Sequence, residues 1–248
     1  LEGLAGREGP FLVQPCIEAV ASPSVLGCVA NPTEVVVGPV GDQVLEGPRW
    51  VGTLFPSELP AALQADLRRQ TARVGRALAG HGYRGLFGCD WLVTPTERVW
   101  FVEVNARKVG SAVEVALACW WGSEGACNVA ALEWAAVRDG TFGRFDSSAR
   151  ALRSPPGVHY SVEFVKERRR VAVSHDLPAP PPEADLFTAE RPVAGAIFDH
   201  PGAGAVLHAG FLARLVGVAE SRSALQALVS EQRRQAEATV APEVVRVG

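Results

Sequence analysis

The 248-residue sequence contains no methionine and only two lysines, Lys108 and Lys166, among its 24 basic residues. The remaining cations are arginines, and with abundant alanine, glycine and proline this bias is typical of coding in a GC-rich genome. The bias therefore describes a genome and indicates no mechanism. Because the chain begins at Leu1 and lacks methionine, we expect it to be part of a longer reading frame.

A strong net charge and a long apolar run are also missing. The formal net charge is −3 and the isoelectric point is about 6.0, so no basic surface for nucleic acid is indicated. No apolar stretch approaches the roughly 20 residues of a membrane-spanning helix. No basic segment followed by an apolar core opens the chain, so we expect no signal peptide. The one basic run, residues 166–170, is predicted to be a solvated hairpin tip. We expect neither a nucleic-acid nor a membrane partner.

The five cysteines form no Cys-x-x-Cys pair, and the five histidines show no spacing typical of metal ligands. Scattered cysteines among apolar neighbours indicate reduced, buried thiols rather than a disulfide framework or a zinc site. We therefore expect a cytoplasmic protein in which both residue types are structural.

Hydrophobic periodicity predicts an α+β protein. Apolar residues recur at helical spacing over residues 60–81, and glycines follow at the end of this segment. Shorter helices are predicted over about residues 113–121, 128–137 and 223–237. Residues 41–60 are rich in glycine and proline and are predicted to be a loop.

Two adjacent strands, joined by the turn-like segment 94–97, carry polar residues on an otherwise apolar hairpin. If that turn sets the pairing, Asp90 lies opposite Phe101. Alternation of side chains then places Asp90, Glu103 and Asn105 on one face and leaves the other face wholly apolar. Glu103 and Asn105 are about 7 Å apart along their strand, and Asp90 is diagonal to Glu103.

Oxygen atoms of Asp, Glu and Asn that converge on one spot suit Mg²⁺, which also keeps positions for water and phosphate. The alternative is a solvent-exposed face with three unrelated polar residues. Leu92 and Phe101 share this face and need cover, which a flat apolar ligand beside a metal-bound phosphate would supply. We therefore predict Asp90, Glu103 and Asn105 as ligands of Mg²⁺, with Mn²⁺ able to replace it.

The segment GYRGLFGCDWLVTPTERVWFVEVNARKVGS, residues 82–111, resembles the metal-binding hairpin of ATP-grasp ligases. That family has Asp or Glu on one strand, then Glu-x-Asn-x-Arg at the end of the next, followed by Gly and a small residue. Asp90 and Glu103 have the matching separation, whereas Ala106 stands where the family usually has proline. The resemblance covers most of the chain but is strong only in this segment.

The resemblance implies the C-terminal lobe of an ATP-grasp domain, an antiparallel sheet with flanking helices, plus a small α+β C-terminal unit. We expect residues 1–145 to form this second lobe, residues 146–156 a linker and residues 157–248 the small module. The first lobe, which brings a lysine and a glycine-rich loop over the phosphates, is missing. We therefore expect a truncated chain that is inactive alone and associates with an upstream lobe or with further copies of itself.

Site residues follow from the same resemblance. The segment FLVQPCIEA is similar to the hinge strand whose backbone binds the adenine edge, and Leu92 would pack against the ring. The implied nucleotide-binding residues are Gln14, Pro15, Cys16, Ile17 and Leu92. Arg107 is the implied catalytic residue, because its guanidinium can contact phosphate or carboxylate oxygens in a bidentate manner. The alternative for Arg107 is a surface salt bridge.

The implied reaction joins a small-molecule carboxylate to an amine with ATP and Mg²⁺, through an acyl phosphate. Two other functions remain open. One is a non-catalytic nucleotide-binding or scaffold fragment of the same fold, and the other is an ATP-grasp kinase that stops after phosphate transfer. The sequence identifies neither the acid nor the amine.

Overall fold

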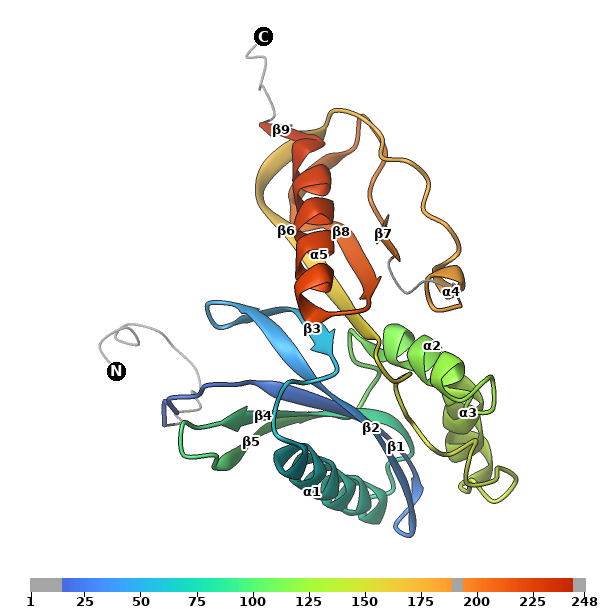
Figure 1. The fold of residues 1–248 in the computed structure, drawn as a ribbon. Helices are drawn as coiled ribbons and strands as arrows, with labels where there is room; N and C mark the ends of the chain where they lie inside the picture. Colours follow the sequence, from blue (N-terminus) through green and yellow to red (C-terminus); the bar gives the residue numbers. More distant parts are fainter. Residues whose placement is uncertain (1–14, 189–193, 243–248) are drawn as a thin grey trace.

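A computed structural model describes residues 15–188 and 194–242 of the chain. Its strands form one antiparallel sheet in the order β5-β4-β1-β2-β3-β6-β8-β7, with the short β9 paired to β6 (Figure 1). The strands are β1 (Pro23–Asn31), β2 (Glu34–Glu46), β3 (Arg49–Phe55), β4 (Gly85–Val93), β5 (Val99–Asn105), β6 (His159–Val173), β7 (Ala194–Phe198), β8 (Val206–Ala219) and β9 (Val240–Pro242). The helices are α1 (Ala61–Gly80), α2 (Ala112–Gly122), α3 (Val129–Asp139), α4 (Glu183–Leu186) and α5 (Arg222–Ala238).

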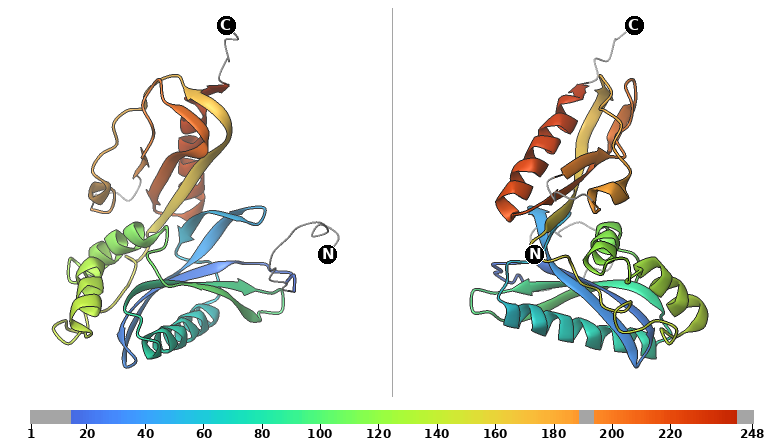
Figure 2. Two further views of the ribbon diagram at one scale, coloured as in Figure 1. Left: turned by 180° about the vertical axis from the view of Figure 1, so that it is seen from behind. Right: turned by 45° about the vertical axis from the view of Figure 1, so that its right-hand side comes forward.

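Helices cover both faces of this sheet (Figure 2). On β1, Val25 and Val29 pack in one cluster with Leu67 of α1, whereas Leu26 and Cys28 pack in another with α2 and α3. Side chains alternate along a strand, so β1 is buried on both faces. When the strand register is followed across the sheet, α5 lies on the α1 face and α4 on the α2 face.

The α+β class and the helices predicted from periodicity are confirmed. The predicted segments 60–81, 113–121, 128–137 and 223–237 correspond to α1, α2, α3 and α5. The side chain of Asn128 caps α3 by accepting a hydrogen bond from the Ala131 amide. None of the described helices has both the length and the apolar character needed to cross a membrane.

The prediction of a loop over residues 41–60 is wrong for residues 41–55, whereas residues 56–60 contain neither helix nor strand. β2 continues to Glu46, Gly47 turns the chain with a φ of +61°, and β3 follows from Arg49. The glycines and prolines that suggested a loop stand between valine, leucine, tryptophan and phenylalanine residues, whose pairing across the two strands decides the structure.

The prediction of a hairpin tip at residues 166–170 is also wrong. These residues lie inside β6, which pairs with β8 over most of its length through two register shifts. At the second shift the Glu167 carboxylate accepts hydrogen bonds from the amides of Arg168 and Arg169. The glutamate thus satisfies backbone donors that the irregular pairing leaves free, so the basic run stays extended.

The sheet continues from the first part of the chain into the last. β3 pairs with β6, which carries the sheet on to β8 and β7. Residues 146–156 contain neither helix nor strand and run beside the sheet before β6 begins. The division at 1–145, 146–156 and 157–248 stays a prediction.

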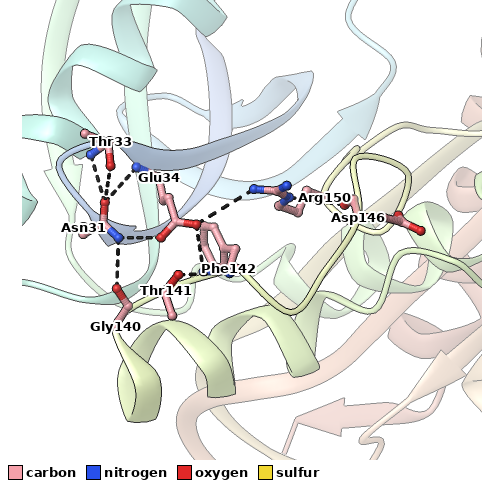
Figure 3. Close-up of polar contacts among 9 residues, drawn as sticks. Asn31, Thr33, Glu34, Gly140, Thr141, Phe142, Asp146 and Arg150 are labelled. Atoms are coloured by element: carbon pink, nitrogen blue, oxygen red, sulfur yellow. Dashed lines mark hydrogen bonds and ion pairs between the residues drawn. The ribbon is translucent and has the colours of Figure 1, made fainter.

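A polar cluster joins the β1–β2 turn to the segment after α3 (Figure 3). The Asn31 amide donates to the Gly140 carbonyl at 3.0 Å. Glu34 Oε1 accepts from the Phe142 amide at 3.1 Å and lies 3.9 Å from a guanidinium nitrogen of Arg150. These contacts tie the β1–β2 turn to the segment that follows α3.

We expect Glu34→Gln to lower the free energy of unfolding by about 1–2 kcal/mol in urea at neutral pH, because it removes charge-assisted hydrogen bonds. Although burial opposes it, hydrogen bonds from Thr141, Asn31 and Phe142 and the charge of Arg150 lower the pKa of Glu34. A lowered folded-state pKa means that the stabilisation is present above the ordinary carboxyl pKa and is lost as pH falls through the folded value. The difference in unfolding free energy between Glu34→Gln and the parent chain should therefore become smaller in acid.

Glu97→Gln is the matched control, because Glu97 is exposed in the β4–β5 turn. It should leave the urea midpoint unchanged. Equal stability of Glu34→Gln and the parent chain at neutral pH would contradict the structural role given to Glu34.

Candidate functional site

The hairpin of β4 and β5 brings the predicted metal ligands to one point. Asp90 pairs directly with Glu103, and Gly88 pairs with Asn105. The Asn105 Nδ2 atom lies 3.2 Å from Asp90 Oδ2 and 3.2 Å from Glu103 Oε1 and donates to both. Asp90, Glu103 and Asn105 therefore share one face, as their alternation predicts.

The predicted register of this hairpin is wrong. Next to the turn the strands pair one residue out of the predicted register, Val93 with Val99, Leu92 with Trp100 and Trp91 with Phe101. A β-bulge between Asp90 and Trp91 then adds a second shift, which pairs Asp90 with Glu103. Trp91 and Phe101 make an edge-to-face contact with ring centroids 5.2 Å apart. Phe101 therefore lies on the α1 face, and Trp100 takes its place beside Leu92. The turn sequence alone cannot show a bulge, because the extra residue enters in mid-strand.

Asp90 is the most enclosed of these ligands, and two neighbouring strands contact it. Burial and the nearby charge of Glu103 raise the pKa of Asp90, while hydrogen bonds to Ser24 and Gln43 oppose the rise. Ser24 stands directly opposite Asp90 on β1. Glu103 lies on the edge strand β5 and is exposed. The Asp90 carboxylate is thus held by the neighbouring strands, whereas the exposed Glu103 side chain can change its conformation.

Arg107 joins the same group from the segment that follows β5. Its Nη2 donates to Asn105 Oδ1 at 2.9 Å and its Nη1 to the Lys108 carbonyl at 3.1 Å. Both acceptors are neutral oxygens. The neighbouring Lys108 turns away and forms an ion pair with Glu133 at 3.0 Å. The structure therefore places Arg107 among the three predicted ligands and Lys108 on the surface beside α3.

Asp90, Glu103, Asn105 and Arg107 line a cavity of about 160 Å³. Its other walls are Ser24, Gln43, Trp50, Thr53, Val109, Gly110 and Ser111. Trp50, near the start of β3, donates from Nε1 to Thr53 Oγ1 at 3.2 Å, and this hydrogen bond orients its ring. Gly110 packs against this ring, and a Cβ there would be 2.3 Å from Trp50 Cη2. Only glycine fits without moving Trp50.

A larger cavity of about 560 Å³ shares one lining residue, Gln43, with the first. Leu92, predicted to pack against adenine, is one of its walls, as are the segments 19–22 and 58–60. Arg222, the first residue of α5, also lines it and forms ion pairs with Asp42 and Glu58. The part of the chain from β6 onward, called the C-terminal unit below, thus contributes directly to this cavity.

The predicted hinge residues are placed less clearly. Gln14 lies outside the described residues. Pro15 and Cys16 are exposed, Ile17 is half-buried, and none of the three is in a helix or strand. The lining of the larger cavity begins at Ala19, and the Val20 amide donates to the last carbonyl of β4 at 2.8 Å. The nucleotide-binding roles of residues 14–17 stay predictions.

Several lining residues escaped the sequence analysis. They are Ser24, Gln43, Trp50, Thr53 and Arg222. A signal existed for Gln43 and Thr53, which pair with each other on the Asp90 face. The prediction of a loop over residues 41–60 hid this pairing of Gln43 with Thr53. Arg222 is more than one hundred residues away in sequence, and only the tertiary fold brings it here.

The donor set suits a magnesium ion that keeps several other ligands. Within residues 15–188 and 194–242, no group of three or more acidic, histidine or cysteine side chains is placed so that it could hold a metal ion. The chain therefore offers two carboxylates and one amide oxygen, and Mg²⁺ ordinarily completes six ligands with water and phosphate. The raised pKa of Asp90 points the same way, because a cation between Asp90 and Glu103 would offset both burial and repulsion.

Comparison with known proteins gives one curated relative in part of the chain. An L-propargylglycine–L-glutamate ligase from Streptantibioticus cattleyicolor is 34% identical over 104 residues, which cover 42% of this chain and 21% of the relative. No protein-family model matches the sequence. The matched region thus spans about a fifth of that relative's length.

Solved structures match nearly the whole chain. N5-carboxyaminoimidazole synthase from Aspergillus clavatus, in complex with ADP and 5-aminoimidazole ribonucleotide, has a TM-score of 0.61 at 13% identity and covers 90% of this chain and 53% of its own. L-amino acid ligase from Bacillus licheniformis has a TM-score of 0.60 at 13% identity, with 92% and 55% covered.

A third structure is the biotin carboxylase domain of Hydrogenobacter thermophilus 2-oxoglutarate carboxylase, in complex with MgADP, at a TM-score of 0.59 and 10% identity. It covers 90% of this chain and 46% of its own. The chain thus spans about half the length of these proteins, and at such low identity the likeness concerns the fold. The chain has the ATP-grasp fold, as its resemblance to ATP-grasp ligases implies.

Proposed function

We propose that this chain forms the magnesium–nucleotide face of an ATP-dependent ligase that joins a small-molecule carboxylate to an amine through an acyl phosphate. The observation that carries the proposal is the convergence of Asp90, Glu103, Asn105 and Arg107 on one cavity. Further support comes from the curated relative and one structural neighbour, which are both named as ligases. Two other neighbours hold ADP, one of them with magnesium.

The two cavities that share Gln43 suggest how ATP would lie. The larger one, with Leu92 in its wall, has room for a nucleoside, and the smaller one holds the polar groups that suit phosphates. Gln43 lines both and would lie near their junction. The backbone of residues 14–17 would face the adenine edge. In this arrangement the terminal phosphate points toward Arg107.

Asp90, Glu103 and Asn105 would hold Mg²⁺, which when bound neutralises phosphate charge during transfer; Mn²⁺ would serve as well. Asn105 now turns its Nδ2 toward the carboxylates and its Oδ1 toward Arg107. To act as an oxygen ligand beside the carboxylates it must turn its amide over. Nδ2 would then face Arg107, which cannot accept a hydrogen bond. The same rotation would therefore release Arg107 to contact substrate.

Arg107 would orient the reacting groups. Its planar guanidinium can contact two oxygens of a phosphate or a carboxylate at once, which a lysine cannot do. Ser24 and Gln43 would keep Asp90 aimed at the cavity through their hydrogen bonds. Trp50 and the glycine that packs against it would exclude water from one side.

Amino acids are the first substrates to test, because the curated relative and one structural neighbour are named as ligases that act on them. We also propose that the remaining cations over the phosphates come from an upstream lobe or from another copy of the chain. A cytoplasmic location is part of the proposal, supported by five free cysteines, four of them buried.

The test is a panel of carboxylates and amines, assayed for ADP release with the complete gene product, since this chain spans only part of its relatives. We expect ADP release that needs both an acid and an amine. Release that needs the acid alone would instead identify a kinase. Nucleotide binding without any turnover would identify a scaffold and overturn the proposal.

In the same protein, Arg107→Lys should reduce turnover by about a hundredfold, the scale at which a phosphate or oxyanion donor acts. The melting temperature should not change, because Arg107 is exposed and its contacts are local. Lys108→Arg is the control, since Lys108 faces Glu133 and not the cavity. Near-normal turnover of Arg107→Lys would show that Arg107 has no role in the reaction.

The metal assignment makes a prediction for this chain by itself. Glu103→Gln should lower the pKa of Asp90, because a repelling charge is removed, and Ser24→Ala should raise it, because a stabilising hydrogen bond is lost. Carboxyl carbon NMR shifts followed against pH measure both. In the complete protein, Glu103→Gln should also weaken Mg·ATP binding measured by calorimetry. Unchanged Mg·ATP affinity would refute the ligand role of Glu103.

A further inference from the structure

A second ionic cluster lies on the sheet face that carries the site, centred on Arg214 of β8. Arg214 Nη1 contacts Glu114 Oε1 at 2.8 Å and Glu183 Oε1 at 2.6 Å, and Nη2 contacts Glu183 Oε2 at 3.0 Å. Nε donates to Asp199 at 3.0 Å, and the guanidinium lies over the Phe198 ring. Every nitrogen of this arginine is thus engaged.

The cluster joins distant parts of the chain. Glu114 belongs to the first turn of α2, Glu183 begins α4, Asp199 follows β7 and Arg214 lies in β8. Both ribbon views show α4 beside α2, so the C-terminal unit contacts the helix that follows the site (Figures 1 and 2). The cluster is the polar part of this contact.

Glu114 depends on this contact because it is completely buried. Burial raises the pKa of Glu114 to about 7, a rise that a backbone hydrogen bond and Arg214 oppose and Glu183 increases. Among the described residues its second oxygen, Oε2, has no hydrogen-bond partner. A buried carboxylate is stable only when a counter-charge accompanies it. Without Arg214, the first turn of α2 would have to open or take up a proton at Glu114.

The first turn of α2 is continuous with the site. Ser111, the residue before the helix, lines the smaller cavity and precedes Glu114 by three residues, about 4.5 Å of helical rise. Residues 106–111 contain neither helix nor strand and carry Arg107 and Gly110 into the cavity wall. This segment is held by β5 at one end and by α2 at the other. The position of Arg107 therefore depends on where α2 begins.

We propose that Arg214 is a positioning residue for Arg107: by holding Glu114 it fixes the start of α2 and, with it, the segment 106–111. The consequence for turnover rests on the proposed function, whereas the consequence for local structure does not. The small C-terminal unit then acts on the site through a defined ion pair as well as by extending the sheet.

The first measurement is amide hydrogen exchange on this chain. Arg214→Met should speed exchange in peptides covering residues 106–115 by about tenfold or more through local opening, and leave α1 and the β1–β2 hairpin unchanged. Arg233→Met is the matched control. Arg233 also bridges the C-terminal unit to the rest of the sheet, through Glu163 at 3.0 Å and Glu46 at 3.4 Å, but its partners lie on β6 and β2 rather than on α2.

Glu114→Gln keeps the proposal testable if Arg214→Met does not fold, because it removes the buried charge together with the ion pair. Glu114→Gln should also increase amide exchange in the peptides covering residues 106–115, but by less than Arg214→Met does. Unchanged exchange at residues 106–115, or an increase spread evenly over the chain, would overturn the positioning role for either variant. This result does not depend on whether the protein is a ligase.

The second measurement uses turnover of the complete protein. If Arg214 acts through Arg107, the loss caused by Arg214→Met should largely disappear in an Arg107→Lys background, because the contact it supports is already gone. The KM for ATP should stay within about twofold while kcat falls, since Leu92 and the larger cavity are not touched. Losses that multiply in the double variant would show a general structural role and overturn the proposal.

Discussion

The direct pairing of Asp90 with Glu103 is the constraint around which the site is arranged. Like charges placed opposite each other destabilise an antiparallel pair, and burial adds to the cost at Asp90. The fold compensates with hydrogen bonds from Ser24, Gln43 and Asn105 and by leaving Glu103 exposed on the edge strand. A sheet built only for stability would place apolar or oppositely charged residues here, which is the physical reason for proposing a cation at this point.

The C-terminal unit belongs to the framework of this site. β6 pairs with β3 and carries the sheet into β8, and one apolar cluster runs from α2 and α3 into the unit. Within it, the Tyr160 ring stacks on Phe55 with centroids 4.8 Å apart and meets Phe187 edge-on at 5.7 Å. Arg222 then reaches the larger cavity and Arg214 reaches α2. Packing and charge together couple the unit to residues that would bind the nucleotide.

The two cavities differ in the groups that line them. The larger one combines Leu92 and other apolar residues with the charged side chains of Asp42, Glu58 and Arg222, whereas the smaller one gathers two carboxylates, an amide and a guanidinium. Asn105 connects the groups of the smaller cavity, because its amide bonds to both carboxylates on one side and to Arg107 on the other. In the proposed function, a cation bound by the carboxylates would therefore change the hydrogen bond between Asn105 and Arg107.

The sequence by itself determined four helices, α1, α2, α3 and α5, and placed the polar residues of the candidate site close together. Helical periodicity is local, and Asp90, Glu103, Asn105 and Arg107 lie within eighteen residues on one hairpin, so spacing and alternation sufficed. Only the tertiary structure decided the bulge that pairs Asp90 with Glu103, the strand nature of residues 41–55, and the arrival of Arg214 and Arg222. These features depend on pairing and packing between segments far apart in the chain, whose energies no local pattern records.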